Sequence, residues 1–171
     1  AAHVRCTDFN VGMDHLTNAL EDIRIEGEIG QIYPGSKKNL KDLAGHLAQE
    51  GMLQVTGREA AVDVFGKYAN LTMRRDRLSQ DLGGLAEEIE RVMDSRYGAK
   101  IRKQVDKILA GEIRSTQDAK KRAEKLYKLL KEQEQEQQQQ NQQNQDGQAS
   151  EQADDSDSSS GESGEDSAEE S

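Results

Sequence analysis

The chain lacks most of the residues from which a large or cross-linked core is built. Its 171 residues include no Trp, one Pro and one Cys, and aromatic side chains make up only 4%. The single Cys6 excludes an internal disulfide framework and suits a reducing compartment. Because hydrophobic residues account for only 33% of the sequence, we do not expect a large core.

Long apolar runs are missing as well. No stretch approaches the roughly 18 consecutive apolar residues of a membrane-spanning helix, and no basic and then apolar leader opens the chain. We therefore expect a cytoplasmic protein with no membrane partner. We also expect that the sequence starts inside a larger protein, because Ala1 stands where an initiator Met would be.

Positive charge is absent from the last part of the chain. Residues 132–171 contain 13 Asp and Glu and no Lys or Arg, so a tail of −13 follows a body near +3. The tail is a Gln/Asn block followed by a Ser/Asp/Glu/Gly block. Such a composition buries too little apolar surface to offset the entropy of ordering. We expect residues 132–171 to form a disordered, low-complexity acidic linker.

Residues 1–131 carry apolar positions at helical spacing, and no β-branched run alternates with period two long enough to require a sheet. Leu16, Leu20 and Ile23 form one such apolar stripe. The sequence therefore predicts an all-α fold, an irregular helical bundle of about five to six helices. The expected helices cover residues 11–31, 36–51, 56–73, 78–93, 97–109 and 115–131.

Two local signals set expected helix boundaries. Thr56 and Glu59 have the spacing of a capping box, which predicts that a helix begins at Thr56. Gly83 and Gly84 predict a break or a delayed start in the helix at 78–93.

A metal site is the chemistry that the start of the chain suggests. Zinc hydrolases of the His-Glu-x-x-His type place two imidazoles one helical turn apart and often take a third ligand from a carboxylate on a later helix. Ala1-Ala2-His3 fits the end of such a motif, and the interval from His3 to Glu21 leaves room for a turn and a return helix. His3 and Glu21 are thus candidate zinc ligands. The alternative places Glu21 on the wet face of an amphipathic helix, where Arg24 is its neighbour.

Other groups carry weaker signals. His15 and His46 have no ligand partners at recognised spacing, and no residue in the chain receives a catalytic role. The basic runs at 74–77, 100–103 and 120–122 lack interleaved aromatic residues, and acids punctuate most of them, so we expect no nucleic-acid partner. No Walker-type phosphate loop is present. If ATP takes part, another protein binds it.

Two stretches near the start carry a family resemblance. They are His3-Val4-Arg5-Cys6-Thr7-Asp8-Phe9 and Asn18-Ala19-Leu20-Glu21-Asp22-Ile23-Arg24-Ile25-Glu26. With the acidic composition of the tail, they resemble the N-terminal region of cobaltochelatase T-subunit-like proteins of bacteria, phages and plasmids. These resemble the wider group of von Willebrand factor A proteins that work with MoxR-type AAA+ ATPases.

The resemblance implies an architecture and a function. In that family a helical N-terminal region and an acidic linker precede a von Willebrand A domain with a metal-ion-dependent adhesion site, so Mg²⁺ would belong to a downstream domain. The chain would be a non-catalytic part of an adaptor in a hetero-oligomer, coupling a MoxR-type AAA+ ATPase to metal insertion or client remodelling, as in cobalamin biosynthesis. His3 would match the second histidine of a His-Glu-x-x-His helix, and Glu21 the third ligand.

Two other functions stay open beside the adaptor. One is a zincin-like metallopeptidase fragment with an incomplete His-Glu-x-x-His site, in which His3 and Glu21 hold zinc. The other is a purely structural helical module. Zinc analysis with a Glu21→Ala variant and capture of a MoxR-type ATPase separate the three.

Overall fold

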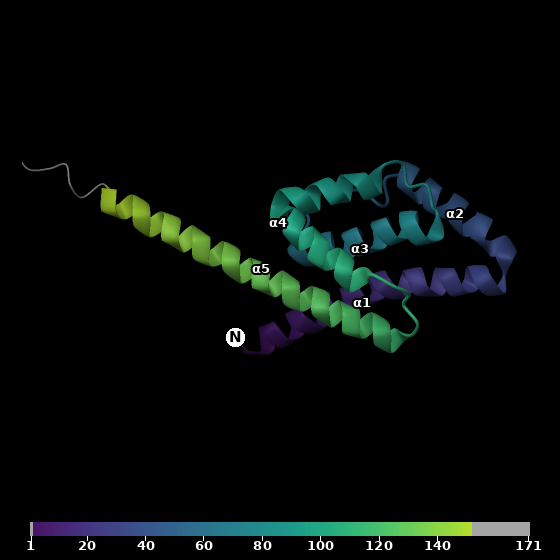
Figure 1. The fold of residues 1–171 in the computed structure, drawn as a ribbon, viewed down its shortest axis with the longest axis horizontal. Helices are drawn as coiled ribbons and strands as arrows, with labels where there is room; N and C mark the ends of the chain where they lie inside the picture. The colour runs from purple at the N-terminus through teal and green to yellow at the C-terminus, as the bar shows by residue number, and fades with distance from the viewer. Residues whose placement is uncertain (1, 152–171) are drawn as a thin grey trace, which may run out of the picture. The chain divides into compact units, whose positions relative to one another are not determined.

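Helices account for all the regular structure across residues 2–151. The computed structural model describes the backbone of these residues and the side chains of residues 10–142. The helices are α1 (Ala2–Ile32), α2 (Pro34–Gln49), α3 (Ala61–Leu78), α4 (Leu85–Leu109) and α5 (Thr116–Glu151) (Figure 1). The predicted all-α fold is therefore confirmed. No helix in the described part of the chain combines the length and apolar character needed to cross a membrane.

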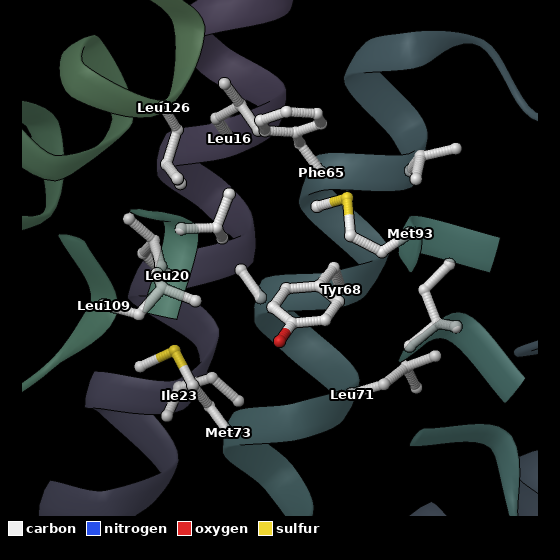
Figure 2. Packing of buried hydrophobic residues seen from close by; sticks show 14 of the residues in the cluster. Leu16, Leu20, Ile23, Phe65, Tyr68, Leu71, Met73, Met93, Leu109 and Leu126 are labelled. Atoms are coloured by element: carbon white, nitrogen blue, oxygen red, sulfur yellow. The ribbon is translucent and has the colours of Figure 1, made fainter. Parts of the chain in front are cut away.

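The core lies between α1, α3 and α4. The predicted stripe of Leu16, Leu20 and Ile23 on α1 is buried and faces α3, whose Phe65 and Tyr68 are also buried (Figure 2). α4 adds Met93 and Leu109, and α5 adds Leu126. Burying each such side chain contributes about 1.5–3 kcal/mol, so this cluster supplies the main stabilisation of residues 1–134, which form one compact unit.

The helix expected to begin at Thr56 begins at Ala61 instead. One contact of the predicted capping box forms, because the Thr56 N–H donates to Glu59 Oε1 at 2.7 Å, while Thr56 Oγ1 accepts from the Arg58 N–H at 3.2 Å. However, Gly57 has a φ of +73°, which a right-handed helix does not allow. The contacts therefore close a turn that precedes α3 and do not start the helix.

The two helices expected at 78–93 and 97–109 correspond to the two helical segments of α4, which meet at a kink. Gly83 and Gly84 both have positive φ, which delays the start of α4 to Leu85. Gly98 separates the two helical segments of α4, because its φ of 83° and ψ of 159° are not helical and turn the chain into a kink.

α5 continues well beyond its expected end near Lys131. Its residues 132–151 are helical, whereas their composition predicted a disordered linker. Gln and Glu are good helix formers, and Lys131 pairs with Glu134 at 2.7 Å across one turn, so helix propensity extends α5 without burial. Residues 135–151 belong to a second unit, and residues 152–171 of the predicted linker lie outside the described residues.

Candidate functional site

The two predicted zinc ligands lie on one continuous helix. The zinc-site hypothesis requires a turn between His3 and Glu21, but α1 has no break between Ala2 and Ile32. At a rise of 1.5 Å per residue, the Cα atoms of these two residues lie about 27 Å apart along the axis, whereas zinc ligands lie about 2 Å from their ion. The side chains of His3 and Cys6 lie outside the described residues. Zinc at His3 stays a prediction, but Glu21 does not complete that site in this conformation.

Glu21 is instead bound on both carboxylate oxygens. The Arg24 guanidinium donates to Oε1 at 3.0 Å and to Oε2 at 2.8 Å, and the Thr116 hydroxyl donates to Oε2 at 3.2 Å. The Arg24 and Glu21 side chains are each 15% exposed. The hydrogen bonds from Arg24 lower the pKa of Glu21 below its usual value. Glu21 therefore joins α1 to the first turn of α5.

A second network joins α1 to α3 and was not foreseen. Arg74 contacts Glu26 Oε1 at 2.6 Å and donates to Gln80 Oε1 at 2.9 Å, while the Gln80 amide donates to Glu26 Oε2 at 2.9 Å. The three side chains thus close a ring. Arg74 also donates to Asn70, whose amide donates to the Ala19 carbonyl at 3.2 Å.

This ring was not predicted, because Arg74 was considered only as part of the basic run at 74–77. Glu26 and Gln80 lie 54 positions apart, so no local spacing rule pairs them.

The predicted minor candidates occupy different places. His15 Nε2 lies 3.3 Å from Asp63 Oδ1, and the imidazole is 45% exposed. It lies so close to α3 that a Cβ added at Gly66 would be 2.8 Å from Nε2, so Gly66 is needed for this approach. His46 is exposed on α2.

The basic runs contribute ion pairs and helix-end contacts. Arg75 contacts Glu87 at 3.1 Å and Glu90 at 2.8 Å, which ties α3 to α4. Arg102 contacts Asp94 at 2.7 Å across the kink at Gly98. These arginines hold helices together within the described structure.

Arg122, from the third basic run, binds the end of α4. Its guanidinium donates to the carbonyls of Leu109 and Ala110 at 2.9 Å, of Gly111 at 3.1 Å and of Glu112 at 2.7 Å. The Leu109 carbonyl belongs to the last turn of α4, whose partial negative charge a cation stabilises, and the other three carbonyls belong to the cap and the loop that follow it.

Where side chains are described, no three His, Cys, Asp or Glu residues come close enough together to hold a metal ion. Comparisons with protein-family models, with curated proteins and with solved structures found no match. The arrangement itself is an ion-paired helical scaffold, in which the carboxylates of Glu21 and Glu26 are held by arginines from the same or a neighbouring helix.

Proposed function

We propose that the chain is the helical, non-catalytic region of an adaptor similar to the cobaltochelatase T subunit. In this function a MoxR-type AAA+ ATPase supplies ATP-driven remodelling, and the adaptor couples it to metal insertion or to a client within a hetero-oligomer. The assignment rests on the resemblance at residues 3–9 and 18–26 and on the composition of the tail.

One observation supports it more than any other. The stretch at 18–26 supplies contacts from α1 to α3 and to α5, since Glu21 reaches Thr116, Glu26 reaches Arg74 and the Ala19 carbonyl accepts from Asn70. If related adaptors share this helical framework, the residues that hold its helices together should also be the ones that resemble the family. Its carboxylates are used for assembly of the bundle, which favours the adaptor over the metallopeptidase fragment.

Capture of the ATPase tests the proposal. The full chain is immobilised and incubated with a MoxR-type ATPase encoded in the same genome, with ATP, with a slowly hydrolysed analogue and without nucleotide. We expect retention that depends on nucleotide. An Arg74→Ala variant should lose capture together with its folded structure, whereas Arg58→Ala, on an exposed turn, should retain it.

Failure of capture in all nucleotide states would contradict the adaptor function. A purely structural module would then remain, recognisable because the full chain folds and yet retains no ATPase.

A further inference from the structure

Two adjoining clefts share a floor at the C-terminal half of α1. One, of about 450 Å³, lies between α1, α2 and the end of α3, and the other, of about 440 Å³, lies between α1, the end of α3 and residues 112–114. Gly27, Gln31, Arg77 and Leu78 line both clefts. We call this feature the Gly27 groove.

The floor of the groove is open because of a glycine that the fold does not require. Gly27 has no positive φ, and an added Cβ would have a single neighbour within 4 Å, Leu78 Cδ2 at 3.8 Å. Glycine within a helix costs about 1 kcal/mol relative to alanine. Neither a positive φ nor a close contact at Gly27 explains this cost, and the glycine leaves the floor beside Leu78 open.

The walls of the groove carry positive charge. Lys37 and Lys41 on α2 are exposed, and neither has an ion-pair partner among the residues with described side chains. Arg77 adds a third cation, which donates to the Leu109 carbonyl.

The acids near the groove are already occupied. Glu26 is held by Arg74 and Gln80, and Glu28 accepts from Arg24 at 2.6 Å. Glu112, which lines the second cleft, lies 3.9 Å from Arg114, a further cation of the same cleft. The charge left to face a ligand is therefore positive.

We propose that the Gly27 groove binds an acidic peptide segment of a partner protein. An apolar side chain of the peptide lies over Gly27 and Leu78, and its carboxylates face Lys37, Lys41 and Arg77. Two clefts in sequence suit an extended or helical segment better than a single small anion, and no aromatic residue lines them for the base stacking that single-stranded nucleic acids use. The inference does not depend on the ATPase, because an acidic segment can belong to any partner.

Peptide binding to the full chain tests the groove. The probe is a fluorescein-labelled twelve-residue peptide of the repeat Glu-Glu-Leu, followed by fluorescence anisotropy. The Gln-Gln-Leu repeat and a single-stranded DNA oligonucleotide are the comparison ligands. We expect the acidic peptide to bind at least ten-fold more tightly than either, with an affinity that falls as salt is added. No binding of the acidic peptide, or tighter binding of the DNA, would overturn the proposal.

Matched variants locate the site. Gly27→Leu fills the floor with a residue of higher helix propensity, so affinity should fall at least ten-fold while the thermal unfolding midpoint does not. The double variant Lys37→Glu with Lys41→Glu should weaken binding similarly. If Gly27→Leu has a lower unfolding midpoint, the affinity of the Lys37→Glu, Lys41→Glu double variant decides whether the groove is the binding site. The control is the double variant Lys100→Glu with Lys103→Glu, at exposed positions on α4. An equal loss of peptide affinity in this control would contradict the assignment of the site to the Gly27 groove.

Discussion

Glu59 is the residue whose ionisation contributes most clearly to stability. Its side chain is 7% exposed, Oε1 accepts from Lys67 Nζ at 2.9 Å and from the Thr56 N–H, and Oε2 has no hydrogen-bond partner in the described structure. Burial opposes ionisation of this carboxyl, but the hydrogen bonds outweigh it and lower the pKa of Glu59 to about 2 from the ordinary 4.5.

The sign of the pH effect follows from that lowered pKa. Because the folded state holds the proton less tightly, the contribution of Glu59 is fully present above pH 4.5 and is lost as the pH falls towards about 2. We expect Glu59→Gln to cost about 2 kcal/mol at neutral pH and to flatten the pH dependence in this window. Urea unfolding at a series of pH values measures both. The exposed Glu50→Gln variant is the control. If Glu59→Gln has the same dependence of unfolding free energy on pH as the parent chain, Glu59 does not make this contribution.

Replacing Glu21 separates its structural role from a zinc-binding role. Glu21→Ala leaves Arg24 with Glu28 as its remaining partner, and we expect a loss of about 1 kcal/mol in the free energy of unfolding. Zinc bound per chain, measured by atomic absorption, should not change. Asp22→Ala, at the exposed neighbour, is the control. The metal hypothesis would be restored if the parent chain and Asp22→Ala bind zinc while Glu21→Ala, still folded, does not.

At the scale of the element, the end of α4 depends on a side chain from α5. Arg122→Ala removes four donor contacts from carbonyls 109–112, and we expect it to cost about 2 kcal/mol in urea unfolding. Arg122→Lys should recover only part of this, because an ammonium cannot span the carbonyls as a planar guanidinium does. The exposed Lys121→Ala should be neutral, and equal effects of the three changes would exclude the capping role.

The kink in α4 depends on one backbone conformation. At Gly98, φ and ψ of 83° and 159° lie in a region that only glycine enters readily. Gly98→Ala should therefore cost about 2 kcal/mol, in contrast to the usual gain when glycine is replaced in a helix. Calorimetry on Gly98→Ala and on Gly35→Ala, where an added Cβ has open space, compares the two. A stabilised Gly98→Ala protein would show that the kink is dispensable.

Secondary-structure elements were predicted correctly where a helix buries one apolar face. The period of Leu16, Leu20 and Ile23 placed the buried face of α1 correctly, because burial rewards that spacing. The contact between Thr56 and Glu59 was predicted correctly. It does not begin a helix as expected, because the positive φ of Gly57 is incompatible with a right-handed helix. The predicted end of α5 near Lys131 was too early. It was placed where the apolar stripe ends, but the helix propensity of Gln and Glu extends α5 to Glu151 without burial.

At the scale of the whole molecule, residues 1–134 should be independently stable. They contain the buried core and the ion pairs described above, whereas residues 135–151 form a polar continuation of α5. A chain that ends at Glu134 should show the same calorimetric midpoint as the full chain within about 2 °C, equivalent to a few tenths of a kcal/mol. A clearly lower midpoint would show that the second unit contributes to the stability of the first.

The candidate site was less predictable than the fold, for a reason that also belongs to the whole molecule. Ion pairs between distant residues, such as Arg74 with Glu26, are created by the packing of α1 against α3 and leave no periodic trace in the sequence. Likewise, the open floor at Gly27 is visible only once Leu78 and the adjoining clefts surround it.

The burial of Tyr68 gives this Trp-free protein its own spectroscopic probe. Tyr68 donates to Asp106 at 2.6 Å, and burial together with this hydrogen bond raises its pKa above the ordinary value of 10. Burial also raises the pKa of Tyr97, whose ring meets Phe65 edge to face. In an alkaline absorbance titration these two phenols should therefore ionise late, and their near-ultraviolet circular dichroism should vanish when packing is lost, even while the helices persist.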